Sequence, residues 1–227
     1  FLKIIFKILI SRLPIPYAFW KVIGFFKHGK MDSCEYAIKI FDLHFYRAFP
    51  KNIPQNLKIL ELGPGDSIAS AIIGFAYGAS CTYLVDVDYY VTKNLNFYIR
   101  LISILKTKGF RTPDISEAKS IEDLLKLCNG IYLTNGLSSL QSIESTSIDF
   151  VWSHSVLEHI RKYQFFEIQR ELKRLLKTSG KASHSIDFQD HLDYGLNNLR
   201  FSEKIWESKL FANSGFYTNR IPAIKMN

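Results

Sequence analysis

Cysteine is scarce in this 227-residue chain, and its three cysteines stand far apart with no C-x-x-C pair. A disulfide framework and a cysteine-ligated zinc site are therefore not expected. The chain also lacks internal repeats and low-complexity tracts, so neither a repeat architecture nor a disordered tract is indicated. With 47% hydrophobic and 15% aromatic residues it can instead fill a substantial core. These features favour a globular protein of the reducing cytosol, and we expect a cytoplasmic location.

Acidic side chains are missing from residues 1–31, where the charged residues are Lys3, Lys7, Arg12, Lys21, Lys27 and Lys30. The formal net charge of +8 therefore lies mainly at this end, and the rest of the chain is nearly balanced. A nucleic-acid enzyme more often carries its basic surface around the active-site face. We therefore expect no nucleic-acid partner.

The basic end also lacks an apolar run long enough to cross a bilayer. Its sequence, FLKIIFKILISRLPIPYAFW, mixes long apolar side chains with single cations, and its first run ends at Pro14. A membrane span requires about 20 apolar residues. We interpret the segment as helical, with residues 1–20 in peripheral contact with an anionic membrane. The alternative, which is the commoner one, is a helix packed on its own domain or on a partner subunit. No small-residue cleavage site follows the run, which disfavours a signal peptide.

Strands and helices alternate through the rest of the sequence. Residues 32–49 form a predicted helix capped by Asp32 or Ser33, and the sequence PKNIPQN then breaks the chain. The apolar patterns that follow predict strands over residues 57–62, 81–87, 131–134, 147–154 and 181–187, and helices over 66–77, 89–108, 120–128 and 164–179.

This order predicts an α/β fold: a Rossmann-like, doubly wound, mostly parallel sheet with helices on both faces, plus an N-terminal helical segment. We divide the chain into that segment, residues 1–50, and a sheet domain, residues 51–227. In the tail, SEKIWESKLFANSGF predicts a helix, a glycine stop and the start of one more strand. Such a sheet usually finishes with two antiparallel strands, and the chain begins with Phe1 rather than Met, so we expect a trimmed or partial sequence.

A glycine turn follows the first predicted strand, in the sequence KILELGPGDSIASAI. A dinucleotide-binding turn has the pattern G-x-G-x-x-G and places backbone N–H groups against pyrophosphate. Here Ile68 replaces the third glycine, and Glu61 and Asp66 flank Gly63 and Gly65. Each pairing of phosphate with a carboxylate at about 4 Å costs roughly 1–4 kcal/mol. The turn therefore favours a nucleoside that carries positive charge and no phosphate, as S-adenosylmethionine does.

A second acidic position follows the next predicted strand, in the sequence YLVDVD. Asp86 stands about 20 residues after the glycines, where a carboxylate can bind both ribose hydroxyls of a nucleoside. Asp88 is its near neighbour. The alternative is that both aspartates only initiate a turn, a common use of this residue type.

Several stretches together resemble one protein family. ILELGPGDS, YLVDVD, YLTNGLSSL, SIDFVWSHSVLEHI and RELKRLLKTSGKASHSID, followed by DH, are similar in content and order to the class I S-adenosylmethionine-dependent methyltransferases. The resemblance covers residues 57 to about 190. It implies S-adenosyl-L-methionine as the cofactor and transfer of its methyl group to an acceptor.

The resemblance also assigns roles to individual residues. It implies that Glu61, Gly63 and Gly65 line the methionine part of the cofactor, with Asp66 close by, and that Asp86 binds the ribose. The remaining positions implied to contact the cofactor are Asn135 and Gly136, near the adenine, and Ser153 and His154, which reach the cofactor or the acceptor. Asn135 departs from the acidic residue frequent in the family, although an amide can also bond to an adenine edge.

Candidate proton acceptors lie at or beyond the ends of the last two predicted strands: Glu158, His159, His184, Asp187, Asp190 and His191. A histidine near its ordinary pKa of about 6.5 can take a proton at neutral pH. We favour His191 as the general base, with Asp187 as its helper or as a substrate ligand. Two histidines and two aspartates within eight residues could instead bind a divalent metal, but no further ligand is fixed by a motif, and we expect no metal.

One motif that bears on the methyl acceptor is missing from the sequence. The D/N-P-P-Y motif of enzymes that methylate exocyclic amines of bases or glutamine is missing after the fourth predicted strand. Methylation of nucleic-acid amines is therefore not expected. Our leading hypothesis is a small-molecule or saccharide acceptor, with oxygen as the methylated atom. Two alternatives are a catalytically silent module that binds the cofactor or recruits a partner, and a nicotinamide oxidoreductase on the same fold. The carboxylates around the glycines disfavour the oxidoreductase.

Overall fold

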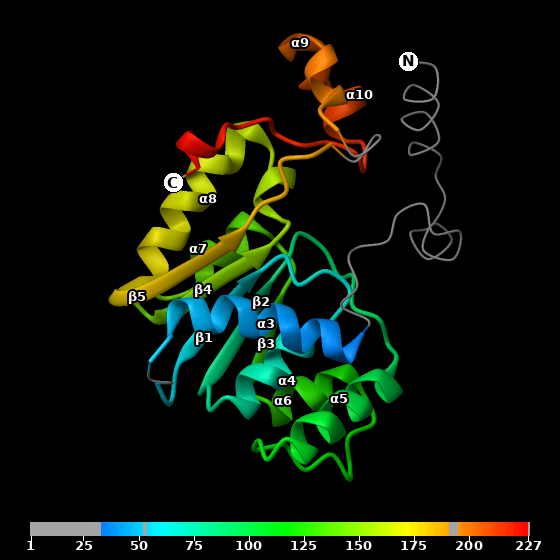
Figure 1. Ribbon diagram of the computed structural model, residues 1–227, viewed down its shortest axis with the longest axis vertical. Coiled ribbons are helices and arrows are strands. Elements are labelled where there is room, and N and C mark those ends of the chain that lie inside the picture. Colours follow the sequence, from blue (N-terminus) through cyan, green and yellow to red (C-terminus); the bar gives the residue numbers. More distant parts are fainter. Residues whose placement is uncertain (1–32, 52–53, 191–194, 227) are drawn as a thin grey trace. The chain divides into compact units, whose positions relative to one another are not determined.

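The computed structural model describes residues 33–51, 54–190 and 195–226, and their path is shown in Figure 1. The predicted N-terminal segment therefore lies largely outside the described residues. The chain divides into two compact units. The sheet unit comprises the described residues up to His154 together with residues 167–185, and the tail unit comprises residues 155–166 and the described residues from Ile186 onward.

The sheet unit contains a five-stranded sheet in the order β3-β2-β1-β4-β5. Its strands are β1 (Lys58–Leu62), β2 (Cys81–Val85), β3 (Gly130–Leu133), β4 (Ile148–His154) and β5 (Leu176–Ser185). Every neighbouring pair is parallel, which confirms the predicted α/β fold. The chain runs outward from β1 to β3 and then returns to β4 beside β1. Ligands of such sheets bind outside the carboxyl ends of the strands, at this reversal of direction.

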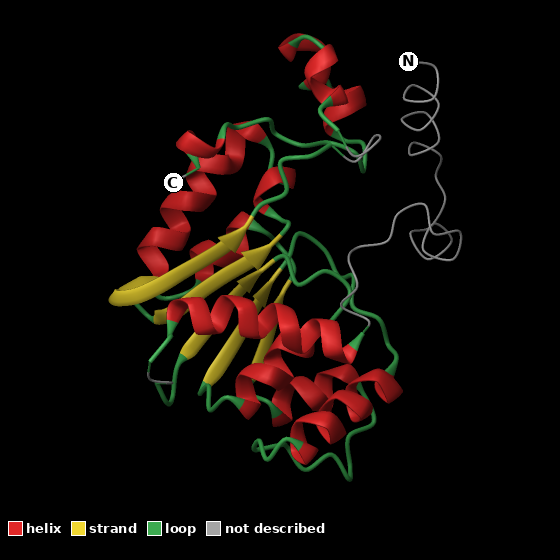
Figure 2. Cartoon of the chain, in the orientation of Figure 1, coloured by secondary structure: helices red, strands yellow, loops and turns green. Residues whose placement is uncertain are grey.

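Helices cover both faces of the sheet (Figures 1 and 2). One face carries α3 (Cys34–Ala48), α4 (Ala69–Ala76), α5 (Leu95–Thr107) and α6 (Ile121–Leu127), whose buried side chains share one core with Phe150 and Trp152 of β4. The opposite face carries α7 (Leu137–Ser142) and α8 (Lys162–Leu175). This two-sided covering is the reason that the strands read as nearly continuous apolar runs.

The ends of several helices follow local signals in the sequence. Ser33 caps α3 by accepting a hydrogen bond from the Tyr36 N–H, and Ser120 and Asp123 form a complete capping box at α6. Gly78 and Gly109 follow the last turns of α4 and α5 with positive φ, as predicted for helix stops.

Other boundaries differ from the prediction. Helix α4 begins at Ala69 rather than residue 66, because the loop after the glycine turn uses Ser67 Oγ to accept the Ala69 N–H. Helix α5 begins at Leu95 rather than residue 89, because the Thr92 N–H is bonded to the backbone of the glycine-turn loop instead. Helix α8 ends at Leu175, where the last carbonyls accept N–H groups of residues 146 and 147, and the chain enters β5 at once.

The described part of the tail unit contains short helices and no strand, so the prediction of one more strand there is wrong. These elements are the 3-10 turns η1 (Leu157–His159), η2 (Asn197–Arg200) and η3 (Ala223–Lys225), and the helices α9 (Glu203–Trp206) and α10 (Lys209–Ala212). The Thr218 carbonyl accepts the Trp206 indole N–H at 2.7 Å, and the Asn219 N–H donates to the Glu158 carbonyl at 2.8 Å. Backbone groups that a strand would pair in a ladder are thus bonded elsewhere.

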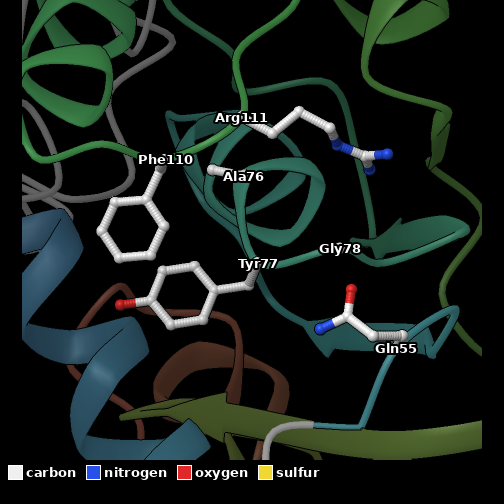
Figure 3. Close-up of a pocket in the computed structure, with 6 residues that line it drawn as sticks. All are labelled: Gln55, Ala76, Tyr77, Gly78, Phe110 and Arg111. Carbon is white, nitrogen blue, oxygen red and sulfur yellow. The ribbon is translucent and has the colours of Figure 1, made fainter.

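A cavity of about 260 Å³ opens at the amino edge of the sheet (Figure 3). Its lining residues lie before β1, between α4 and β2, and after α5: Gln55, Ala76, Tyr77, Gly78, Phe110 and Arg111. The Arg111 guanidinium lies over the Phe75 ring at 4.0 Å and donates to the Phe75 carbonyl, which lies in the last turn of α4. This arginine therefore satisfies a helix end, and the cavity lies at the edge of the sheet opposite to the glycine turn.

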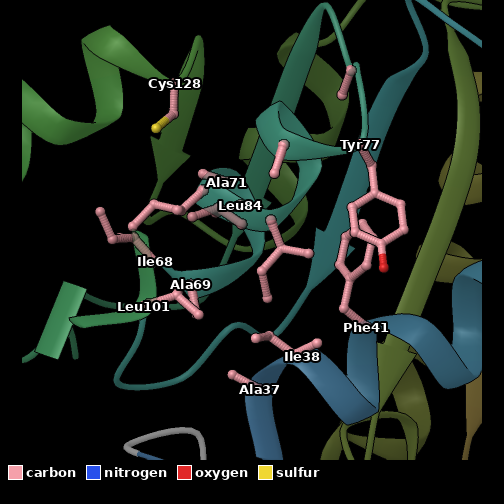
Figure 4. Packing of buried hydrophobic residues seen from close by; sticks show 14 of the residues in the cluster. Ala37, Ile38, Phe41, Ile68, Ala69, Ala71, Tyr77, Leu84, Leu101 and Cys128 are labelled. Atoms are coloured by element: carbon pink, nitrogen blue, oxygen red, sulfur yellow. The ribbon is translucent and has the colours of Figure 1, made fainter. Parts of the chain in front are cut away.

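Aromatic packing holds α3 against the sheet. Phe41 and Phe45 are fully buried, and Figure 4 shows Phe41 beside Tyr77 of the α4 end. Phe41 meets Trp152 edge to face at 5.8 Å, and Phe45 meets Phe150 in the same way at 5.9 Å. Such contacts add about 0.5–1.5 kcal/mol each beyond the burial of apolar area. The position of α3 over β4 is therefore strongly fixed.

We predict that Phe41→Ala lowers the free energy of unfolding by about 3–5 kcal/mol, because the surrounding rings cannot close the cavity left behind. Urea denaturation followed by circular dichroism measures this change. The control is Leu43→Ala on the same helix, where the side chain is 38% exposed and the expected loss is about 1 kcal/mol or less. Equal losses in the two variants would contradict the packing role of Phe41.

Candidate functional site

The glycine turn lies at the carboxyl end of β1 and is bonded to the neighbouring strand. Gly63 and Gly65 have φ of 71° and 64°, a left-handed conformation that other residues adopt at a cost. The Gly63 N–H donates to the Val85 carbonyl at 2.8 Å, and the Gly65 N–H donates to Asp86 Oδ2 at 3.0 Å. Both glycine N–H groups are therefore used within the protein.

Asp86 joins the ends of β1 and β2 through its side chain. Its Oδ2 accepts the Gly65 N–H, and its Oδ1 accepts the Val87 N–H at 2.7 Å. Burial raises the pKa of this carboxyl, and the two backbone hydrogen bonds oppose that shift. A carboxylate has about four acceptor positions, so two remain for hydroxyl groups of a ligand.

Glu61 is a deeply buried acid of the site, with 4% of its surface exposed. Burial raises the pKa of its carboxyl to about 8; the Ser70 hydroxyl opposes the shift, and the nearby Asp86 adds to it. The Glu61 Oε2 atom is buried without a hydrogen-bond partner. A buried oxygen without a partner favours the binding of a cation or of a hydrogen-bond donor at this position. Near pH 7 this carboxyl is therefore mainly protonated until such a group binds, and not charged as the sequence pattern alone indicates.

Asp66 follows the turn and is 4% exposed. Its carbonyl accepts the Thr92 N–H at 2.9 Å, which holds the chain after β2 beside the turn. This contact brings the loop before α5 toward the same edge of the sheet.

The loop after β3 completes this group of strand ends. The Gly136 N–H donates to the Asp86 carbonyl at 2.8 Å, and the Asn135 N–H donates to Ser139 Oγ at 2.9 Å in the first turns of α7. A Cβ added to Gly136 would lie 3.2 Å from a methyl carbon of Val87. The structure thus brings together the positions predicted to bind the methionine part, the ribose and the adenine.

Ser153 and His154 end β4 and point to opposite faces, as alternate residues of a strand do. Ser153 Oγ is fully buried and lies 2.8 Å from His184 Nδ1 on β5. His154 Nδ1 lies 3.3 Å from Nε2 of His44, a fully buried histidine on α3. The other nitrogen of His44 lies 2.8 Å from Ser183 Oγ. His154 therefore belongs to a polar chain on the α3 face, and Ser153 to a pair on the other face.

Sequence reasoning missed His44 as a candidate. The available signal was a histidine on the apolar stripe of a predicted helix, between Phe41 and Phe45. That signal alone more often marks a satisfied core histidine than a functional one.

The candidate catalytic residues after β4 and β5 lie in the tail unit. His191 lies outside the described residues. The Asp187 N–H donates to Glu158 Oε1 at 3.1 Å, while Asp187 Oδ1 accepts the Gln189 N–H at 2.9 Å. Burial raises the pKa of the Glu158 carboxyl to about 7, with Asp187 adding to the shift. The structure therefore pairs Asp187 with Glu158.

The described ranges also bear on metal binding and on membrane spans. Within them, no group of three or more His, Cys, Asp or Glu side chains is arranged to hold a metal ion. No helix among the described residues has the length and apolar character to span a membrane. The three cysteines are free thiols.

Comparisons with known proteins give short or distant matches. No family model matches the sequence. A CinA-like protein from Petrotoga mobilis is 33% identical over 90 residues, which cover 33% of this chain and 22% of that protein. The match therefore spans about a fifth of that protein.

Three solved structures similar to the chain share 15–19% sequence identity with it. One is an S-adenosylmethionine-dependent methyltransferase from Archaeoglobus fulgidus, with 15% identity and a TM-score of 0.36, covering 64% of this chain and 51% of that one. A second is a Haemonchus contortus N-methyltransferase in complex with phosphomonomethylethanolamine and S-adenosylhomocysteine, with 17% identity and a TM-score of 0.42, covering 78% and 33%. The third is PKMT2 from Rickettsia typhi in complex with AdoHcy, with 19% identity and a TM-score of 0.39, covering 63% and 24%. The chain thus spans about half or less of each.

We predict that Glu61→Gln stabilises the ligand-free protein at neutral pH. The unfolded carboxyl ionises near its ordinary pKa of 4.5, whereas the folded one stays protonated up to about pH 8. The contribution of Glu61 to stability is therefore greatest below pH 4.5 and is lost as the pH rises toward 8. The gain of the variant over wild type should grow by about 2–4 kcal/mol between pH 5 and pH 7.5. Urea denaturation at the two pH values measures it, and a gain that is independent of pH would contradict the burial of this acid.

Proposed function

We propose that the chain is an S-adenosylmethionine-dependent methyltransferase and that the carboxyl edge of the sheet unit holds the cofactor. This proposal rests on one observation: both glycine N–H groups of the turn donate hydrogen bonds to other parts of the protein. A pyrophosphate cradle needs such N–H groups free to face the ligand. Here one donates to a carbonyl and the other to the Asp86 carboxylate. The turn is therefore poorly suited to a phosphate and well suited to an uncharged or cationic nucleoside.

The acids at this edge fit the chemical groups of the cofactor. Glu61 offers a buried oxygen without a partner, which suits the positively charged methionine part. Asp86 has acceptor positions left for the two ribose hydroxyls. Asn135 is exposed at the end of β3, where it can bond to the edge of an adenine. When bound, the cofactor supplies a methyl group activated by a sulfonium.

The acceptor is proposed to be a small molecule or a saccharide, methylated on oxygen. This part of the proposal rests on the sequence, which lacks the motif used for exocyclic amines of bases or glutamine. A neutral histidine, His154, at the end of β4 is compatible with a hydroxyl acceptor, which must lose a proton during the reaction.

We predict that Asp86→Ala weakens the binding of S-adenosylmethionine by about 1–3 kcal/mol, because hydrogen bonds from the ribose to a charged acceptor are lost. Isothermal titration calorimetry measures the change. The matched control is Asp88→Ala, two residues further on, whose carboxylate is exposed and accepts the local Tyr89 N–H. If both variants bind the cofactor as wild type does, the ribose assignment is wrong. Binding of NAD with no binding of S-adenosylmethionine would reject the proposed function.

We also predict that the affinity for S-adenosylmethionine rises with pH toward about 8. The cationic part of the ligand favours the ionised form of Glu61, whose pKa is about 8 in the ligand-free site. Below that pH, binding must release the proton, so the affinity should rise by up to about tenfold per pH unit and then level off. Calorimetry in buffers of different ionisation enthalpy counts the released protons. In Glu61→Gln this release should disappear, and its persistence would assign it to another group.

A further inference from the structure

A chain of three polar side chains passes through the core of the sheet unit to the end of β4. Ser183 Oγ lies 2.8 Å from His44 Nδ1, and His44 Nε2 lies 3.3 Å from His154 Nδ1. The three residues come from β5, α3 and β4. His44 has none of its surface exposed, and its ring lies 5.0 Å from that of Trp152. Both of its ring nitrogens are therefore engaged.

His44 carries a single ring proton at neutral pH. Burial lowers the pKa of its imidazole to about 4, and the positive charges that His154, His184 and Arg47 can carry lower it further, against a smaller opposing effect of the hydrogen bond with Ser183. One proton must also lie between the two histidines for their hydrogen bond to form. The tautomers of His44 and His154 are therefore coupled.

Only two arrangements satisfy this condition when both histidines are neutral. In the first, His44 donates from Nδ1 to Ser183 and accepts the Nδ1–H of His154, so that His154 Nε2 has a free lone pair. In the second, His44 donates from Nε2 to His154, and His154 must carry its own proton on Nε2. Uptake of a proton by His154 is possible at Nε2 only in the first arrangement, and the resulting imidazolium keeps its donor bond to His44.

The register of β4 against β1 places His154 at the level of the glycine turn. Trp152 pairs with Glu61 across the parallel strands β4 and β1, and His154 and Gly63 each follow two residues later. The two ring nitrogens of an imidazole point in divergent directions. Because Nδ1 of His154 faces the buried His44, Nε2 faces away from it.

We propose that His154 accepts the proton of the methyl acceptor at Nε2, and that His44 is a positioning residue that fixes the tautomer and orientation of His154. This inference rests on the proposed function. A hydroxyl that is methylated loses one proton: the O–H bond breaks, an electron pair of the oxygen forms the new bond to the methyl carbon, the bond from that carbon to sulfur breaks with its electron pair left on sulfur, and the proton passes to His154 Nε2. His191, which the sequence analysis favoured for this role, lies outside the described residues.

A purely structural role explains less of this arrangement. A buried polar side chain costs free energy unless its hydrogen bonds are made, and an apolar residue would fill the space between Phe41 and Phe45 without that cost. The Ser153–His184 pair on the opposite face of the sheet ends at β5 without a second histidine. It provides a matched comparison within the same unit.

The test is nuclear magnetic resonance of protein labelled with ¹⁵N-histidine, which reports the tautomer and the protonation of each ring. In the wild type, neutral His154 is expected to carry its proton on Nδ1. In His44→Leu this preference should be lost, and the proton affinity of His154 should fall by about tenfold, because the imidazolium loses a hydrogen bond to a neutral acceptor. His184→Asn, which alters the pair on the other face, should leave the His154 tautomer unchanged.

Ser183→Ala provides a second variant if His44→Leu fails to fold. It removes the acceptor of His44 Nδ1, so it should shift His154 toward the tautomer protonated on Nε2. The inference is overturned if wild-type His154 is protonated on Nε2, or if its tautomer is the same in His44→Leu or Ser183→Ala as in wild type. Calorimetry with S-adenosylmethionine on the wild type tests the proposed function separately, since the tautomer measurement needs no ligand.

Discussion

The hydrogen bond from the Gly65 N–H to the Asp86 carboxylate is the constraint on which the candidate site depends. It joins the turn after β1 to the end of β2 and withdraws a glycine N–H group from any ligand. The Asp86 backbone carbonyl in turn accepts the Gly136 N–H, so the loop after β3 is fixed to the same residue. One aspartate therefore sets the relative positions of three strand ends. Its own carboxylate keeps acceptor positions for a ligand because the backbone uses only part of its capacity.

A second constraint acts from the other side of the site. The rings of Phe41 and Phe45 lock α3 over β4 through edge-to-face contacts with Trp152 and Phe150. The same helix carries His44, which lies between these two phenylalanines and contacts the end of β4. Apolar packing thus determines the position of the polar His44 side chain. The packing and the chemistry of this edge are consequently linked through a single helix.

The sequence was sufficient for the fold because its signals are local. Apolar runs bounded by turns marked each of the five strands. Ser33 and Ser120 precede helical patterns in the sequence, and both cap the helices that follow them. The boundaries that differed depend on contacts between distant parts of the chain. Helix α8 ends early because its last carbonyls bond to residues 146 and 147, which no local pattern shows.

For the site, sequence reasoning identified the residues that follow strand ends. It did not predict how burial changes the pKa of their side chains. The positions of Gly63, Gly65 and Asp86 followed from spacing. The protonated state of Glu61 did not, because it depends on how completely the neighbouring elements exclude water. Sequence reasoning did not identify His44 for a similar reason, because its partner Ser183 is 139 residues away in the sequence.

The unpartnered oxygen of Glu61 also has a consequence for the life of the protein in a cell. A fold that buries a carboxyl oxygen without a hydrogen-bond partner loses part of its stability until a ligand binds there. Marginal proteins are removed by proteases in proportion to the time that they spend unfolded. A chain of this kind would persist longest where its ligand is plentiful, so its abundance would follow the supply of that ligand without any dedicated regulator.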